Sequence, residues 1–148
     1  MKHSSRWLVA GLVGFSLQLA ACAQHQDTHQ ALHPVVIEKI EGSEVNRVTM
    51  TERALERIAL KTDKVREERV SRSTSPRMVV PHSSVIYDPK GQSWVYTSPQ
   101  PRTFVRQKVD VEYVEGDRAV LREGPPAGTI VVSTAAAEVY GADFGVGH

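Results

Sequence analysis

The sequence predicts an all-β fold, a small antiparallel barrel or sandwich with one short α-helix. Two observations support this prediction. Short runs of β-branched and aromatic residues alternate with turn signals along most of the chain, and one segment alone has a clear helical pattern. A chain of 148 residues holds one domain at most besides its terminal segments. We divide it into a signal peptide (1–21), a tether (22–34) and a β domain (35–145).

The strongest local signal is a β-hairpin in the middle of the chain. Two runs, 84–87 and 93–96, flank the sequence Asp-Pro-Lys-Gly at 88–91. In a type I turn, Asp at the first position accepts a backbone hydrogen bond, Pro sets φ at the second, and Gly suits the fourth. Pro81 cannot donate to a ladder, so we expect it at the start of the first strand or on an edge.

The remaining strands are predicted from β-branched runs and from alternation of apolar and polar residues. They comprise 35–41, 45–50, 61–70 (a long charged edge strand with Val65 and Val70 as its apolar points), 78–80, 104–113, 118–122 and 129–133. The alternation in 104–113 places Val105, Val109, Val111 and Tyr113 on one parity. We therefore expect that strand to have one buried face and one wet face. Residues 135–140 are expected to add a helical turn.

The predicted helix covers residues 52–60. Thr51 precedes it as a candidate N-cap, and Leu55 and Ile58 begin an apolar stripe. An alternative N-cap is Thr49, which would form a capping box with the Glu three residues later. Two to three helical turns are expected, and a helix this short must pack against the sheet.

The N-terminus has the pattern of a targeting segment. A short basic start precedes a mostly apolar run over 7–19, and the sequence Leu-Ala-Ala-Cys occupies 19–22. This pattern resembles the lipobox of bacterial lipoproteins. The resemblance implies cleavage before Cys22 and diacylglycerol on its sulfur. Two or three acyl chains would then hold the protein on a membrane. The alternative is an ordinary cleaved secretory signal that leaves Cys22 as a free thiol.

Two further inferences follow from this cysteine. Because Cys22 is the single Cys of the chain, no intrachain disulfide can form. In the sorting rule that accompanies the lipobox, Asp after the Cys favours retention at the inner membrane. The residue here is Ala23. The resemblance therefore implies a lipid-anchored protein that faces the periplasm of the cell envelope, with the outer membrane favoured.

The tether contains a regular series of histidines. His25, His29 and His33 recur at every fourth position. On a helix this spacing would place three imidazoles on one face, where they could bind Zn²⁺ or Cu²⁺. The alternative is a solvated spacer, because the segment has little to bury. The metal-binding hypothesis and the spacer hypothesis both stay open at this point.

Composition and motifs indicate contact with other molecules rather than catalysis. The chain has 18 Lys and Arg against 17 Asp and Glu, which gives no basic surface for nucleic acid. His82, Ser83 and Asp88 are the residue types of a catalytic triad, but closeness in sequence is not triad geometry. We therefore expect no enzyme activity and no cofactor apart from the lipid. Four aromatic residues on predicted strands are expected in the core: Trp94, Tyr96, Phe104 and Tyr113.

The order of the segments resembles the membrane-proximal domain of periplasmic adaptor subunits, or membrane fusion proteins, of resistance-nodulation-division (RND) efflux systems. The family has a Val-Pro-x-x-Ala-Val segment, matched at 80–85 with Ser84 in place of Ala. Its Val-Tyr-Val-like strand is matched at 94–96, and its Arg-x-Val strand at 106–109. The closing Gly-rich turn and strand are matched at 124–132. The end of the chain, 136–145, is similar to that of heavy-metal and short adaptor-like members.

One departure from the family shapes the functional expectation. A full adaptor inserts a β-barrel, a lipoyl-like domain and a long helical hairpin between the segments matched by Val65 and Met78, where this chain has only about a dozen residues. The resemblance therefore implies a non-catalytic lipoprotein that is an accessory or truncated adaptor. Its expected partner is an RND transporter or a full-length adaptor. The alternative function is metal binding by the N-terminal histidines.

Overall fold

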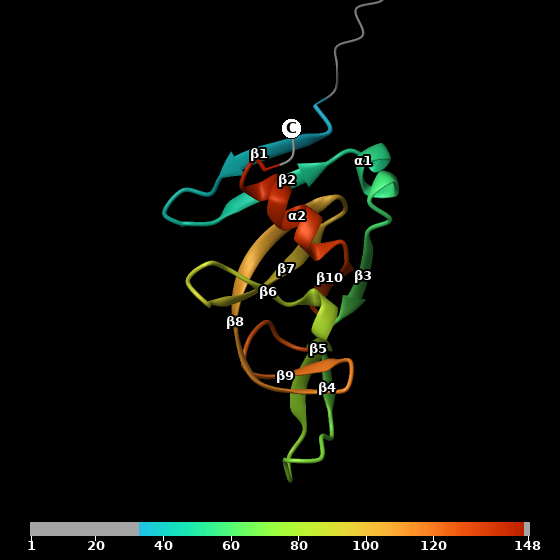
Figure 1. The fold of residues 1–148 in the computed structure, drawn as a ribbon, viewed down its shortest axis with the longest axis vertical. Helices are drawn as coiled ribbons and strands as arrows, with labels where there is room; N and C mark the ends of the chain where they lie inside the picture. Colours follow the sequence, from blue (N-terminus) through green and yellow to red (C-terminus); the bar gives the residue numbers. More distant parts are fainter. Residues whose placement is uncertain (1–32, 147–148) are drawn as a thin grey trace, which may run out of the picture. The chain divides into compact units, whose positions relative to one another are not determined.

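Strand β8 (Thr103–Glu115) is the longest strand and joins the two halves of the sheet. In the computed structural model, which describes residues 33–146, the first half of β8 pairs with β7 (Ser93–Gln100) on one side and with β2 (Asn46–Met50) on the other. Its second half pairs with β9 (Arg118–Glu123). Pairings between the described strands are antiparallel throughout, which confirms the predicted class (Figure 1).

The sheet curls until its two ends meet on one segment of chain. Its path begins at β3 (Lys61–Lys64) and ends at β4 (Arg66–Glu68), and Val65 alone separates these two strands. The Val65 N–H donates to the carbonyl of Thr129 and the Val65 carbonyl accepts from Gly128 N–H, each at 2.8 Å. The full order is β3, β10 (Ile130–Thr134), β7, β8, β9, β5 (Arg77–Pro81), β4.

The inner face of this curled sheet holds one apolar cluster, which we call the inner core. Its buried members come from β5, β7, β8, β9 and β10, from Val65 between β3 and β4, and from Val85 before β6. They are Val65, Val80, Val85, Val95, Val109, Ala119, Leu121 and Val131. Because each strand contributes alternate residues, the opposite parity points outward and needs separate cover.

A second layer covers the outer face of β7, β8 and β10. It consists of helix α1 (Glu52–Arg57), helix α2 (Ala136–Asp143) and the hairpin of β1 (Val35–Lys39) with β2, which remains joined to the sheet because β2 pairs with β8. The buried side chains between the layers form what we call the outer core: Val48, Met50, Ala54, Tyr96, Phe104, Val132, Ala136 and Val139. Strands β7 and β10 are thus buried on both faces, which explains their continuous apolar runs.

The predicted hairpin turn is confirmed. The Gly91 N–H donates to the Asp88 carbonyl at 2.9 Å, and Gly91 has φ of +74°, which glycine adopts without strain. The first strand of the hairpin is shorter than expected, because only β6 (Ile86–Tyr87) pairs with β7. Residues His82–Ser84 form a 3₁₀ turn, and Pro81 lies at the end of β5 rather than at the start of the hairpin strand.

The predicted N-cap of α1 is also confirmed. The Thr51 hydroxyl accepts a hydrogen bond from the Ala54 N–H at 3.2 Å. The alternative cap at Thr49 is wrong because that residue lies in β2. The helix has six residues, fewer than predicted, and Ala59 beyond its end has a positive φ of 50° that stops the helical path.

Two strand predictions need correction. The single edge strand predicted over 61–70 is two strands, because the chain pairs with β10 before Val65 and with β5 after it. The one-sided burial predicted for 104–113 fails in its first half, where Phe104 is buried and the Arg106 side chain is only 10% exposed. The outer layer covers that half of β8, and register shifts between Asp110 and Tyr113 change the parity further along.

Candidate functional site

Most residues of the predicted lipid and metal sites lie outside the described part of the chain. Cys22, His25 and His29 belong to residues 1–32, for which nothing is described. His33 is described and is exposed. Among residues 33–146, no group of three or more His, Cys, Asp or Glu side chains is arranged to hold a metal ion. Over the same residues, no helix combines the length and apolar character that crossing a bilayer requires. Lipidation and metal binding therefore stay predictions.

The three triad-type residues each have a structural role in the fold. The Ser83 hydroxyl donates to the carbonyl of Ser133 at 2.7 Å, which ties the 3₁₀ turn to β10. The His82 backbone N–H donates to the Asp117 carbonyl at 2.7 Å. Asp88 accepts three hydrogen bonds within its own hairpin, as described below. The side chains of Ser83 and Asp88 thus stabilise turns of the sheet, and His82 does so through its backbone.

Strand β1 forms an open edge of the sheet. It pairs with β2 and with no other described strand. The Thr51 N–H donates to the Pro34 carbonyl at 2.9 Å. Because hydrogen-bonded pairs alternate along an antiparallel ladder, the backbone groups of Val35, Ile37 and Lys39 point away from β2. They form a row of donors and acceptors that a further strand could pair with.

The first half of the β1 edge exposes apolar side chains, where sheet edges usually have residues that prevent pairing with another chain. Val36 is 47% exposed and Ile37 is 42% exposed, and both are β-branched. Charged residues appear only in the second half of the strand, at Glu38 and Lys39. Natural sheets usually protect such edges with charges, prolines or bulges. An apolar, unpaired edge is the feature expected of a surface that binds another protein.

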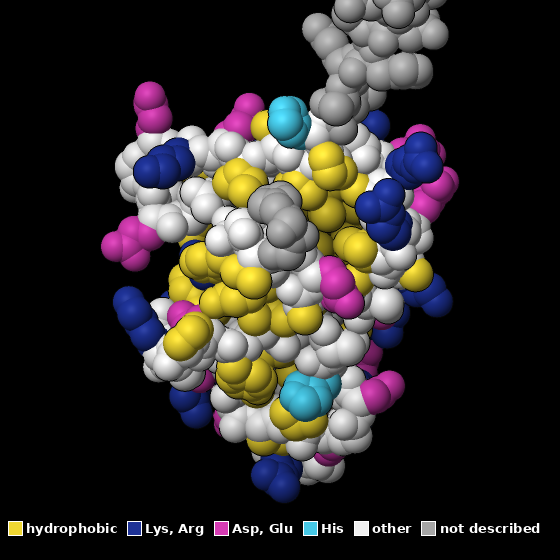
Figure 2. Space-filling model, turned by 45° about the horizontal axis from the view of Figure 1, so that its top comes forward, with side chains coloured by type: hydrophobic (Ala, Val, Ile, Leu, Met, Phe, Trp, Pro, Cys, Tyr) yellow, Lys and Arg dark blue, Asp and Glu magenta, His cyan; other side chains and the backbone are white. Residues whose placement is uncertain are grey.

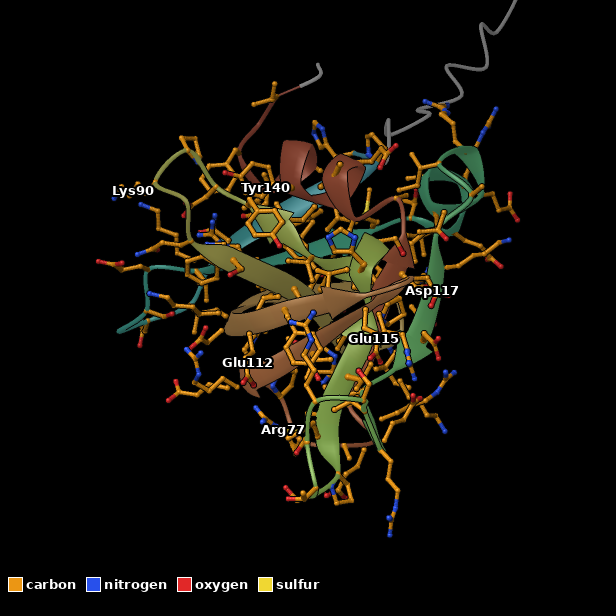
Figure 3. All side chains as sticks on the ribbon, turned by 60° about the horizontal axis from the view of Figure 1, so that its bottom comes forward. Arg77, Lys90, Glu112, Glu115, Asp117 and Tyr140 are labelled. Atoms are coloured by element: carbon orange, nitrogen blue, oxygen red, sulfur yellow. The ribbon has the colours of Figure 1, made fainter. Side chains whose placement is uncertain are left out.

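A second candidate site is a pocket of about 240 Å³ beside α2, which we call the arginine pocket. The Arg106 guanidinium lies between two aromatic rings, 4.3 Å from the centroid of Trp94 and 4.8 Å from that of Phe144. The Tyr140 ring packs against Phe144, with ring centroids 4.7 Å apart and the two planes tilted by 39°. Tyr140 from α2 and Lys90 from the β6–β7 turn lie at this end of the molecule (Figure 3).

A buried carboxylate lies behind the pocket. Asp143 is 4% exposed and accepts hydrogen bonds from the Tyr96 hydroxyl at 2.7 Å and from the Asn46 side-chain amide at 2.8 Å. The Arg106 Nε lies 3.9 Å from the carboxylate and has no hydrogen-bond partner among residues 33–146. Burial, and then the hydrogen bond to Asp143, raises the pKa of Tyr96 well above its usual range. The phenol therefore stays protonated as the donor.

Asp88 forms the outer wall of the arginine pocket. One carboxylate oxygen accepts from the backbone N–H of Lys90 and of Gln92, each at 2.9 Å, and the other accepts from the Trp94 indole at 3.0 Å. Partial desolvation pushes the pKa of Asp88 up, but these hydrogen bonds together outweigh it, so the pKa lies below its usual value. The turn therefore fixes the indole that covers Arg106.

Several charges around the opposite end of the sheet are paired with one another, whereas Lys64, Arg69 and Asp117 form no salt bridge among the described residues. Arg118 contacts Glu68 and Glu115, each at 2.7 Å, beside a cleft of about 290 Å³ that is lined by residues of β3, β4, β5, β9 and β10. Hydrogen bonding to Glu68 raises the pKa of Arg118 further above its ordinary value. Arg77 pairs with Glu112 between β5 and β8 (Figure 3).

Sequence reasoning missed two charged residues, Arg106 of the arginine pocket and Asp143 behind it. The expectation that the four aromatic residues are core holds for Tyr96 and Phe104, whereas Trp94 and Tyr113 are only partly buried. Arg106 was placed on a wet face because it alternates with valines. Asp143 follows a helical turn in a Gly-rich end and carries no local signal of burial. Arg106 stands between Val105 and Gln107, and no neighbouring residue signals its burial.

Comparisons of the chain with protein-family models, with curated proteins and with solved structures found no match.

Proposed function

We propose that this chain is a non-catalytic envelope lipoprotein that acts as an accessory or truncated adaptor of an RND-type efflux system. It would be held at a membrane by acyl chains on Cys22, and it would contact the transporter or a full-length adaptor by protein–protein contacts. The observation that carries the proposal is the open edge of β1, where exposed Val36 and Ile37 accompany unpaired backbone groups. An edge of this kind suits contact with a strand of another protein.

The topology is compatible with a shortened adaptor. In the family, long insertions separate the two halves of the membrane-proximal domain. Here β4 is joined to β5 by residues 69–76, and the two strands pair directly, so the sheet is complete without an insertion. Strand β3, which comes just before β4 in the chain, pairs with the C-terminal strand β10. On this proposal, the domain would provide contact surfaces without the inserted parts that in a full adaptor extend across the envelope.

Co-purification from membranes tests this proposal. The full chain would be expressed with its own signal sequence in its native host, crosslinked and purified, and the recovered proteins identified by mass spectrometry. We expect a transporter or an adaptor subunit among them. The variant Ile37→Lys places a charge on the β1 edge and should reduce that recovery at least fivefold. Val114→Lys is the matched control, because Val114 is 40% exposed on β8 and lies away from β1.

Two results would contradict the proposal. Recovery of neither a transporter nor an adaptor with the wild-type chain would remove the adaptor role. Equal recovery with the Ile37 and Val114 variants would remove β1 as the contact. Intact mass of the purified chain shows whether Cys22 carries acyl groups, and Cys22→Ser should release the chain from the membrane fraction if lipid alone holds it there.

A further inference from the structure

An apolar groove lies between α1, the start of β1 and α2. One part of it, with a volume of about 520 Å³, is lined by residues that include Val35, Ile58, Ala137 and Val146. A second part of about 390 Å³ continues along α1, and the two share Pro34, Ala54 and Arg57 as lining residues. Pockets of about 300–1,000 Å³ with mostly apolar walls are typical of sites for small molecules. Hydrophobic side chains gather over this part of the surface (Figure 2).

Two arginines flank the groove on the side of α1. Arg53 and Arg57 are four residues apart on a helix, so they lie on one face, and both line the second part of the groove. Both are exposed, and neither takes part in a salt bridge within residues 33–146. The acidic residue that lines the groove, Glu138, belongs to α2 on the other wall. Figure 2 shows basic side chains bordering the hydrophobic area on the side of α1.

We infer that this groove binds an acidic phospholipid. The apolar walls take an acyl chain, and the guanidinium groups of Arg53 and Arg57 bind the phosphate of the head group. Guanidinium suits this role because its planar donors can form paired hydrogen bonds with phosphate oxygens. A groove with apolar walls and two unpaired cations on its α1 side matches an amphiphile whose phosphate keeps a net negative charge. In phosphatidylcholine the choline cation balances that charge, and a cationic peptide would be repelled.

The position of the groove in the chain supports a membrane lipid as the occupant. Pro34, which lines both parts of the groove, is also the residue through which the tether joins the domain. Cys22 is 12 residues before Pro34 in the sequence. A chain segment of that length spans at most about 40 Å when fully extended. The inference rests on the proposed function to this extent, because a lipid on Cys22 would keep the groove within that distance of the bilayer.

Native mass spectrometry of the full chain, purified in detergent, tests the inference. Phosphatidylglycerol and phosphatidylcholine with identical acyl chains would be titrated separately. We expect one phosphatidylglycerol to bind at least tenfold more tightly than phosphatidylcholine. The double substitution Arg53→Ala with Arg57→Ala should remove that preference. Ala137→Trp, which fills the groove from an exposed position on α2, should weaken binding of both lipids.

The matched control removes two cations from other surfaces. Arg69 and Lys108 are exposed, and neither forms a salt bridge in the described chain. The variant with both changed to Ala should bind phosphatidylglycerol as the wild type does. Hydrogen exchange gives a second measurement, since phosphatidylglycerol should protect the amides of α1 and α2 selectively in the wild type.

Three outcomes would overturn the inference: equal affinity for the two lipids, loss of binding in the control variant, or binding that neither groove variant changes. The last outcome would also arise if the N-terminal part of the chain filled the groove. Intact mass in the same experiment reports acylation of Cys22 independently. Failure of the proposed membrane anchor is thereby distinguished from failure of the groove.

Discussion

The inner core and the outer core use different means to hold their elements in place. The inner core is a cluster of apolar side chains on strands whose positions the sheet ladders already fix, and the hydroxyl of Ser84, next to its member Val85 in the chain, is buried without a hydrogen bond to any described residue. The outer core has apolar side chains of similar burial, but Asp143 is buried beside it with Arg106 nearby. Burying a charge is costly unless it is paired and hydrogen-bonded. The difference indicates that α2 needs a directional polar contact to fix its position, whereas the ladders already fix the positions of the strands.

Helix α2 has few interactions of its own that would fix its position. It has eight residues, and its N-cap, Ala135, provides no side-chain hydrogen bond and has a left-handed φ of 66°. Isolated helices of this length are marginal in water. Asp143 at its last turn links it to β2 through Asn46 and to β7 through Tyr96. We infer that these two hydrogen bonds set the rotation and the axial position of α2 on the sheet.

The largest effect is expected from removing the buried carboxylate. Asp143→Ala leaves the Tyr96 hydroxyl and the Asn46 amide without their acceptor and leaves the Arg106 charge without its partner. We expect a loss of about 3–5 kcal/mol in the free energy of unfolding, the range for breaking a buried charge pair from one side. Urea denaturation followed by circular dichroism measures it.

The matched control is Asp143→Asn, which keeps the shape and one acceptor oxygen. It should cost less than the Ala variant, since one of the two hydrogen bonds can be retained. Hydrogen exchange should show α2 opening first in both variants. A loss below about 1 kcal/mol for Asp143→Ala would mean that the buried carboxylate contributes little, as exposed ion pairs do.

The next effect comes from the inner core and should have a different character. Leu121 is 1% exposed and lies on β9 facing the curled sheet. Leu121→Ala removes buried methyl groups and leaves a cavity, so we expect a loss of about 3 kcal/mol, within the usual range for buried Leu→Ala changes. Hydrogen exchange should speed up over all strands together, because the ladders share this core. Selective opening of α2 in this variant would refute the distinction between the two cores.

The sequence predicted the elements whose signals are local. The hairpin turn at 88–91 and the Thr51 cap depend on residues within a few positions of one another, so propensity and hydrogen-bonding chemistry identify them. The predictions for 61–70 and for the first half of β8 failed because their outcome depends on partners far along the chain. Nothing near Val65 indicates that the strand changes partner there, and nothing near Arg106 indicates that a second layer covers it.

The same reasoning applies to the candidate sites. Exposed Val36 and Ile37 have a sequence typical of a buried strand, and only the topology shows that β1 is an edge. The groove and the arginine pocket both join α2 to segments more than thirty positions earlier in the chain, which periodicity alone cannot place together. Lipidation of Cys22, in contrast, depends on a contiguous motif and needs no fold to be predicted.

The smallest expected effect, and the one with a pH signature, is that of Tyr96→Phe. This change keeps the ring in the outer core and removes the hydrogen bond to Asp143. A hydrogen bond to a charged group contributes about 1.5–3 kcal/mol, so we expect a loss near 2 kcal/mol at pH 7.

The folded state holds the Tyr96 proton more tightly than the unfolded state, where the pKa is about 10.0. The stabilisation is therefore fully present below pH 10 and is lost as pH rises above it. Other groups also titrate there, but they are common to both proteins. The stability difference between wild type and variant should thus narrow above pH 10 by about 1.4 kcal/mol per pH unit. Urea denaturation at pH 7, 9, 10 and 11 measures this, and a difference that stays constant across the series would show that Tyr96 is not the buried donor to Asp143 that the outer core requires.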